Sequence, residues 1–283
     1  MNDPRPTPGS ALDAVLADLV VLTERLDTLV AARPEADWRR ATPAEGWDVA
    51  TQVAHLWWTD VAATAAANAA TDKAEWDAIV LTVLEDPDGA VDTSALAGGA
   101  VPPTELLATW RAGRTALVDA LLAHAAEHPG EKLPWFGPPM SPTSMASARY
   151  METWAHGLDV HDALDVVPEH DDGVRHVCHI GFRTRDFAHR NRGLEPPTAP
   201  FHVKLTAPSG EVWTYGPDDA EQRVEGPAVD FAQLVTQRRH RDDLALTAHG
   251  AEVDRWLDLA QAFAGPPGGG RAPAAHRPEG GDA

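Results

Sequence analysis

The chain is organised around the stretch Arg149-Tyr-Met-Glu-Thr-Trp-Ala-His-Gly-Leu-Asp-Val-His-Asp162, which lies in an otherwise apolar segment with helical periodicity. Within it, Glu152 and His156 are four residues apart, so a helix places both on one face, one turn from each other. Arg149 and Asp159 lie three residues to either side and extend this polar stripe. Polar groups on a helix flanked by core residues need partners, and a metal ion is one way to supply them.

The spacing of apolar residues predicts four long helices, which together make a helix bundle. These helices begin near Ser10, Asp48, Leu106 and Ser141. Ser10, Asp48 and Ser141 are typical N-cap residues, and the last of them is followed by proline at the first helical position. A shorter helix is expected over residues 72–84, followed by a loop rich in Gly, Pro and Asp that extends to Pro103.

The sequence pattern changes after about residue 170. Residues 201–205 and 211–215 alternate with a period of two around the turn at residues 208–210, which predicts a β-hairpin. Further helices are expected over residues 175–191, 229–238 and 252–263, with a strand over residues 244–247.

These patterns predict an α+β protein with two domains. The helix bundle is expected over residues 10–170 and a smaller α+β domain over residues 171–264. Residues 1–9 and the Gly-, Pro- and Ala-rich tail over residues 265–283 are predicted to be disordered.

Composition narrows the possible partners and the compartment. The formal charge of −20 argues against nucleic acid and against an anionic membrane surface, which both need clustered Lys and Arg. The single cysteine, Cys178, excludes an internal disulfide, and no apolar run approaches the roughly 20 residues that span a bilayer. The chain opens without a basic, apolar signal segment. We therefore expect a cytoplasmic protein, a monomer or homodimer, that acts on a small molecule.

The main chemical candidate is a metal site formed by His55 on the second predicted helix together with Glu152 and His156. Two imidazoles and one carboxylate suit a divalent metal and leave a position for water or substrate. A solvated or hydrogen-bonded polar face is the alternative. The sequence has no glycine-rich phosphate loop, no Gly-x-Ser-x-Gly, no Cys-x-x-Cys and no His-Glu-x-x-His. The other histidine pairs are interpreted as structural: His124 with His128, and His176 with His179.

Two segments carry a resemblance to a known family. Gly46-Trp-Asp-Val-Ala-Thr-Gln-Val-Ala-His-Leu56, followed by residues 149–159, resembles the metal-binding pattern of the DinB-like bundle superfamily. More narrowly, it is similar to the actinobacterial mycothiol-dependent maleylpyruvate isomerase group. That group has a histidine on the second helix and a Glu-x-x-x-His pair on the last, which are filled here by His55, Glu152 and His156.

The resemblance extends through residues 225–241 and 246–256 and so covers most of residues 10–263. It implies a DinB-like bundle, a divalent metal with zinc foremost, and mycothiol as a thiol cofactor. The chain departs from related sequences at Val235-Thr-Gln-Arg-Arg-His-Arg241, where they often carry a Leu-Trp-Gly-Arg-like segment. Whether Arg238, Arg239 or Arg241 would bind substrate stays open, and the chain is more similar to a subgroup of unassigned substrate than to the isomerase itself.

Three functions are compatible with such a site. The metal could hold a low-molecular-weight thiol as thiolate, which adds to a small electrophile and gives isomerisation or S-transfer. A metal-activated water would make the protein a metallohydrolase, and a non-catalytic module that binds metal or a small ligand is the third possibility.

Several other residues are candidates for roles around the metal. Asp159 is a natural acceptor for the N–H of a ligand histidine. Arg149 could pair with a substrate carboxylate, with Asp162 or with another acid. The remaining candidates for substrate binding are Trp58, Trp135, Arg238 and Arg241, although tryptophan in a bundle is more often part of the core.

Overall fold

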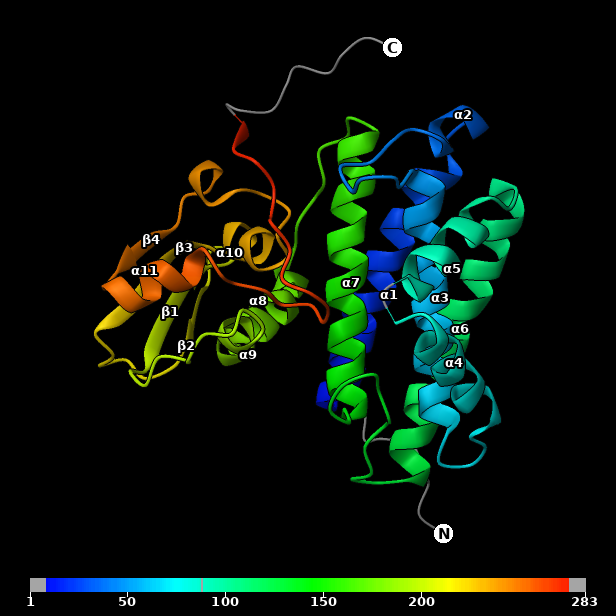
Figure 1. The fold of residues 1–283 in the computed structure, drawn as a ribbon, viewed down its shortest axis with the longest axis horizontal. Helices are drawn as coiled ribbons and strands as arrows, with labels where there is room; N and C mark the ends of the chain where they lie inside the picture. The colour runs from blue at the N-terminus through cyan, green and yellow to red at the C-terminus, as the bar shows by residue number, and fades with distance from the viewer. Residues whose placement is uncertain (1–8, 88, 275–283) are drawn as a thin grey trace. The chain divides into compact units, whose positions relative to one another are not determined.

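The computed structural model describes residues 9–87 and 89–274, and the chain divides into two compact units with the boundary after Pro168. Of the two ends predicted to be disordered, residues 1–9 and 265–283, the parts at residues 1–8 and 275–283 lie outside the described residues. The predicted fold class is confirmed: a helix bundle is followed by a small α+β unit (Figure 1). In the described part of the chain, no helix is long and apolar enough to cross a membrane.

The first unit is built on four long helices that run side by side in Figure 1. They are α1 (Ala11–Ala31), α3 (Val49–Asn68), α6 (Pro103–Glu127) and α7 (Pro142–Ala163). The predicted caps form. Ser10 accepts from the Asp13 amide in a capping box, and the Asp48 and Ser141 side chains accept from the third residue of their own helices.

Three shorter helices complete this unit: α2 (Glu35–Trp38), α4 (Ala74–Glu85) and α5 (Ala90–Gly99). The prediction of a loop up to Pro103 is wrong, because α5 occupies most of this segment. Its last residues, Gly98 and Gly99, pack on α3. A Cβ on Gly99 would lie 2.9 Å from Thr51 Oγ1, and one on Gly98 would lie 3.0 Å from Ala54 Cβ. The glycines that suggested a loop therefore allow close packing of two helices.

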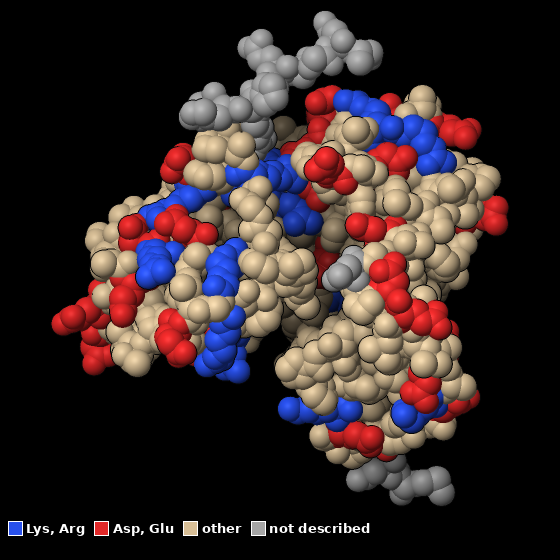
Figure 2. All heavy atoms as spheres, in the orientation of Figure 1, with Lys and Arg blue, Asp and Glu red and all other residues tan. Residues whose placement is uncertain are grey.

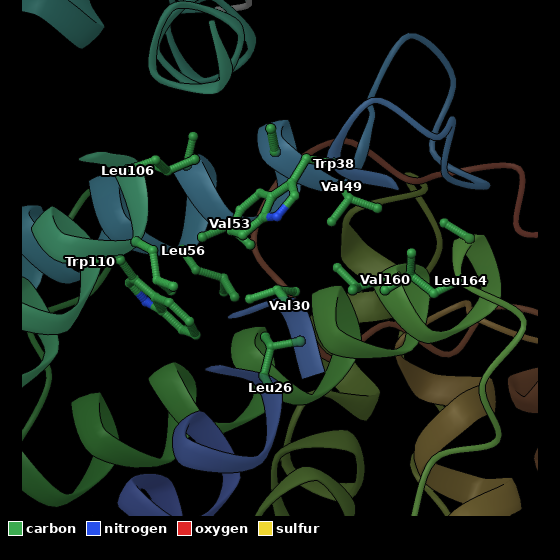
Figure 3. Packing of buried hydrophobic residues seen from close by; sticks show 14 residues of the cluster. Leu26, Val30, Trp38, Val49, Val53, Leu56, Leu106, Trp110, Val160 and Leu164 are labelled. Atoms are coloured by element: carbon green, nitrogen blue, oxygen red, sulfur yellow. The ribbon is translucent and has the colours of Figure 1, made fainter. Parts of the chain in front are cut away.

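The core of the bundle lies between the four long helices (Figure 3). Leu26 of α1, Leu56 of α3 and Trp110 of α6 are all at most 3% exposed and belong to one cluster with Val160 of α7. Each such side chain contributes about 1.5–3 kcal/mol when it is fully buried. Because Leu56 follows His55 directly, this cluster fixes one side of the helix that carries the first predicted ligand.

The second unit contains a four-stranded sheet with the order β2-β1-β3-β4. Its strands are β1 (Phe201–Thr206), β2 (Val212–Tyr215), β3 (Gln222–Pro227) and β4 (Thr247–His249). The predicted hairpin is confirmed as the antiparallel pair β1 and β2. The strand β3, which pairs parallel with β1, was not predicted, and the last strand lies later in the chain than the predicted residues 244–247.

The helices of this unit are shorter than expected: α8 (Arg175–Arg183), α9 (Arg185–Arg190), α10 (Ala228–Val235) and α11 (Ala251–Leu257). The single helix predicted over residues 175–191 is broken at Thr184. Two single 3-10 turns, at Asp172–Val174 and Arg241–Asp243, complete the unit. Its core includes Trp256, whose ring centroid lies 5.6 Å from that of Phe201 and 5.8 Å from that of Phe231.

Cys178 is fully buried in this second unit. Its Sγ donates to the Ala228 carbonyl at 3.3 Å, and burial raises the pKa of its thiol. Cys178 is therefore a core residue.

Candidate metal centre

The structure brings the three predicted ligands together from two helices. The distance from Nε2 of His55, on α3, to Oε2 of Glu152, on α7, is 3.5 Å, and Nε2 of His156 lies 3.2 Å from the same oxygen. One donor atom of each residue lies within 4.8 Å of the others. Among the residues that the structure describes, this is the one group of three or more His, Cys, Asp or Glu side chains that is so close together.

The alignment of α3 with α7 is held by a buried ion pair. Arg149 Nε donates to Asp60 Oδ1 at 2.9 Å, and the two side chains are only 2% and 4% exposed. Asp60 lies on α3 beyond His55, and Arg149 lies on α7 one turn before Glu152. Burial raises the pKa of Asp60, and the charge of Arg149 opposes this rise. The predicted polar stripe therefore has two parts: one residue of an ion pair, and the α7 residues of the candidate ligand group, which consists of His55, Glu152 and His156.

A tight loop places Trp47 against both imidazoles. Its ring centroid is 5.2 Å from that of His55 and 5.9 Å from that of His156. The loop is closed by a bridge between Ala41 and Asp48, and Gly46 supplies the positive φ of 78° that the turn needs. Trp47 thus covers one side of the two histidines.

Trp47 also lines an open pocket of about 410 Å³. The other residues around this pocket include Arg39, Asp48, Thr51 and Leu96.

The ligand group combines burial with limited access. The side chains of His55, His156 and Glu152 are 9%, 14% and 22% exposed. Burial alone would raise the pKa of Glu152, but the adjacent His156 and His55 hold this pKa well below its usual range. His55 Nδ1 is buried and has no hydrogen-bond partner among the described residues.

The acceptor for His156 Nδ1 is Gln52, at 2.6 Å. The role predicted for Asp159, as acceptor for the N–H of a ligand histidine, stays a prediction. Asp159 is 1% exposed and lies within the buried face of α7. The signal for Gln52 was its position three residues before His55, on the same face of a helix with buried neighbours.

The two predicted tryptophans lie in one aromatic cluster of the first unit. Trp58, one turn after His55, stacks on Phe136 with 6.4 Å between ring centroids and 8° between ring planes. Trp135 contacts Phe136 at 5.0 Å and stacks on Trp76 at 5.9 Å. Trp58 is partly exposed, so its ring is available near the ligand group.

The predicted arginines have neighbours of their own. Arg149 is bound inside the bundle to Asp60, in place of the substrate or Asp162. In the second unit, Arg238 Nη1 donates to the Thr236 carbonyl at 2.7 Å, and Arg241 pairs with Asp254 and Asp258.

Other histidines have structural partners. His124, one of the pair with His128, is buried with Nδ1 2.9 Å from the Ala67 carbonyl oxygen. His161 Nδ1 lies 3.1 Å from the Val166 carbonyl oxygen, and burial lowers the pKa of this imidazole.

The donor set fits a divalent metal. Two imidazole nitrogens and one carboxylate oxygen are ligands that zinc accepts, and three protein ligands leave a position open. The donors come from rigid helices, so they would need little movement to converge on one ion.

Comparison with solved structures shows the same fold. The mycothiol-dependent maleylpyruvate isomerase matches with a TM-score of 0.58 at 15% identity, over 85% of this chain and 95% of that chain. A crystal structure of a mutant of that enzyme matches with the same TM-score at 14% identity. Two uncharacterized proteins of Mycobacterium tuberculosis, from strains CDC 1551 / Oshkosh and H37Rv, are each 50% identical over 256 residues, which is 90% of this chain and 97% of theirs.

Two family models match the chain. Residues 197–249, which include the whole sheet of the second unit, match the model described as wyosine base formation. Residues 19–161, about half of the chain, match the mycothiol maleylpyruvate isomerase N-terminal domain. This second range contains His55, Glu152 and His156. The chain therefore belongs to the mycothiol maleylpyruvate isomerase N-terminal domain family.

Proposed function

We propose that this protein is a metal-dependent enzyme that uses a low-molecular-weight thiol, mycothiol, in an isomerisation or S-transfer on a small electrophilic substrate. The observation that carries the proposal is the convergence of donor atoms from His55, Glu152 and His156 within 4.8 Å. Membership of the family and the mycothiol dependence named for the structural neighbour support the choice of cofactor. The substrate of that neighbour is not carried over.

In this proposal the three ligands hold a divalent metal, with zinc foremost. When bound, the metal supplies Lewis acidity that keeps a thiol in its nucleophilic thiolate form near neutral pH. Glu152 contributes the negative charge that neutralises part of a dication, and both imidazoles contribute neutral nitrogen donors. Trp47 excludes water from its side of the histidines.

The substrate is proposed to approach along the aromatic residues of the first unit. Trp58 presents a partly exposed ring one turn from His55, and Trp135 supports it through Phe136. The pocket beside Trp47 has the size of a small-molecule site. These surfaces suit an apolar or planar electrophile and the bulk of a thiol cofactor.

The test is metal content, followed by a thiol titration. We expect close to one metal ion per purified chain, a loss of most of it in His156→Ala, and no loss in the control His128→Ala. His128 is a suitable control because it lies at the end of α6 beside Glu131, outside the ligand group. Cobalt-substituted protein is then titrated with mycothiol, and a sulfur-to-cobalt absorption band is expected.

The possible outcomes separate the functions. Substoichiometric metal in both the wild type and His156→Ala would contradict the metal site. Full metal without a spectral response to mycothiol would contradict the thiol cofactor and would favour a metallohydrolase or a binding module.

A further inference from the structure

A chain of three hydrogen bonds leads from the main chain of Trp47 to His156. Thr42 Oγ1 donates to the Trp47 carbonyl at 2.9 Å, and Gln52 Nε2 donates to Thr42 Oγ1 at 2.9 Å. Gln52 Oε1 lies 2.6 Å from His156 Nδ1. Gln52 is fully buried and Thr42 is 8% exposed, so the chain is protected from water.

The direction of each hydrogen bond in this chain follows from the acceptor at its start, the Trp47 carbonyl oxygen. A carbonyl oxygen can only accept, so the Thr42 hydroxyl uses its one proton on Trp47. The Thr42 oxygen must then accept, which turns the Gln52 amide nitrogen toward it and the Gln52 oxygen toward His156. Because an amide oxygen also only accepts, His156 Nδ1 carries a proton.

This direction fixes the other ring nitrogen. In a neutral imidazole with Nδ1 protonated, Nε2 has a free lone pair. His156 Nε2 lies 3.2 Å from Glu152 Oε2, which is also an acceptor when ionised. When neither atom carries a proton, two acceptors this close repel each other unless a metal cation lies between them. The hydrogen-bond chain therefore prepares His156 and Glu152 to receive a cation.

We infer that Gln52, held by Thr42 and the Trp47 carbonyl, is a positioning residue that fixes the tautomer of His156 and thereby sets the metal affinity of the site. The inference rests on the proposed metal-binding function, but the tautomer itself is a property of the metal-free protein. The same hydrogen bonds hold the loop that carries Trp47 against both histidines. Gln52 therefore connects this loop to His156.

His55 gives an internal contrast. Its Nδ1 has no partner among the described residues, and its Nε2 lies 3.5 Å from Glu152 Oε2, so Gln52 makes no hydrogen bond that would determine its tautomer. Ring contacts with Trp47 at 5.2 Å and with His156 at 4.4 Å orient this ring instead. Replacement of Gln52 should therefore change His156 and leave the tautomer of His55 as it was.

The first test measures the tautomer by nitrogen NMR of the histidine rings. Metal-free protein with ¹⁵N-labelled histidine is studied at a pH where the rings are neutral, and the His156 signals are assigned by their loss in His156→Ala. We expect Nδ1-protonated His156 in the wild type. In Gln52→Met, which has no acceptor, the proton should move to Nε2, where Glu152 accepts it.

The second test measures metal affinity by competition with a chromophoric chelator. Gln52→Met should bind zinc about 10- to 100-fold more weakly, the range typical of a lost hydrogen bond to a ligand histidine. Gln52→Glu restores an acceptor and should recover both the Nδ1-protonated form and most of the affinity. If Gln52 had only a structural role, Gln52→Glu should bind zinc no better than Gln52→Met, because a buried carboxylate destabilises the fold.

Thr64→Val is the matched control. Thr64 lies on the same helix, and its hydroxyl donates to the Asp60 carbonyl one turn back, at 2.8 Å. It should change neither the tautomer nor the affinity, and thermal unfolding confirms that each variant is folded.

An Nε2-protonated His156 in the wild type would overturn the inference, even if the protein binds zinc. Unchanged tautomer and affinity in Gln52→Met would overturn it as well. Absence of metal binding by the wild type with an Nδ1-protonated His156 would instead overturn the proposed function and leave the hydrogen-bond chain intact.

Discussion

Burial of the Arg149 charge costs free energy, yet the buried carboxylate of Asp60 requires this partner. Its guanidinium lies in the bundle interior, bound to Asp60, with 2% of the side chain exposed. Removing both charges from water costs several kcal/mol per ion, so the pair contributes little net stability. Each partner nevertheless makes burial of the other possible. The pair connects α7 to α3 next to the ligand group, so its geometric role exceeds its energetic one.

Replacement of Arg149 by methionine should destabilise the protein strongly. Asp60 is left buried without its partner, and the expected loss is about 3–5 kcal/mol in the free energy of unfolding, measured with urea. The double variant with Asp60→Leu should recover most of this loss. As a control, Arg40→Met removes an exposed partner of Asp165 and should cost about 0–1 kcal/mol. Equal losses for Arg149→Met and Arg40→Met would show that burial of the pair is not the cause.

For single residues, the sequence was sufficient to predict the three donor side chains that the structure brings together, but not the groups that orient them. His55, Glu152 and His156 could be identified because helical spacing and a family resemblance point to the same residues. Helical spacing places Gln52 on the same face as His55, but its role also depends on the Thr42 loop ten residues earlier, whose fold helical spacing does not predict. Likewise, nothing near Arg149 in the sequence indicates Asp60, which is 89 positions away.

The elements of the bundle are connected by polar contacts as well as by the core. Asp27 of α1 accepts from two arginines of α6, Arg111 and Arg114, each with a contact of 2.6 Å. Hydrogen bonding by Arg111, together with the charge of both arginines, lowers the pKa of Asp27 below its ordinary value of 3.8. This contact joins the first helix to the third long helix through charge.

The contribution of Asp27 should therefore depend on pH. A carboxylate whose pKa is lowered by folding stabilises the folded state at pH values above its pKa in the unfolded chain. This stabilisation is lost as the pH falls through the lower pKa of the folded state. Asp27→Asn should cost about 1–3 kcal/mol at neutral pH. Wild type and variant should converge at a pH below the folded pKa, as measured by urea unfolding across the range.

Asp77→Asn is the comparison for this experiment, since Asp77 pairs with Lys73 on the exposed surface of α4. It should have an effect of about 0.5 kcal/mol or less at any pH. A pH-independent loss in Asp27→Asn would mean that packing, and not charge, is responsible.

Among the elements, the long helices and the hairpin were predictable because their periodicity is local. The strand β3 was not, since its sequence Gln-Arg-Val-Glu-Gly-Pro has only one fully buried residue, Val224. Its pairing with β1 on one side and β4 on the other is a tertiary effect. The helix α5 was missed for the same kind of reason, because its glycines are explained only by the helix that they touch.

For the whole molecule, metal binding should be visible as stability of the first unit. A ligand that binds only the folded state stabilises it by about 2.7 kcal/mol at a free concentration of 100 times its Kd. Removal of metal with a chelator should lower the unfolding temperature of the wild type but not of His156→Ala. Hydrogen exchange should increase in α3 and α7 on metal removal, whereas β1 to β4 of the second unit serve as the internal control. A uniform increase across both units would contradict a local site.

The large negative charge does not come from one acidic patch on the face shown in Figure 2. On that face, Asp and Glu side chains are distributed over both units and are interspersed with Lys and Arg. With a net charge of −20, this distribution favours repulsion between copies of the chain.

Burial of Cys178 has a consequence for redox behaviour. Thiol–disulfide exchange requires an accessible thiolate, and the one cysteine of the chain is enclosed in the core with its proton held. An oxidised small thiol therefore has no sulfur on the folded protein with which to form a mixed disulfide. The folded protein can meet both the reduced and the oxidised forms of a thiol pool without becoming covalently trapped by either.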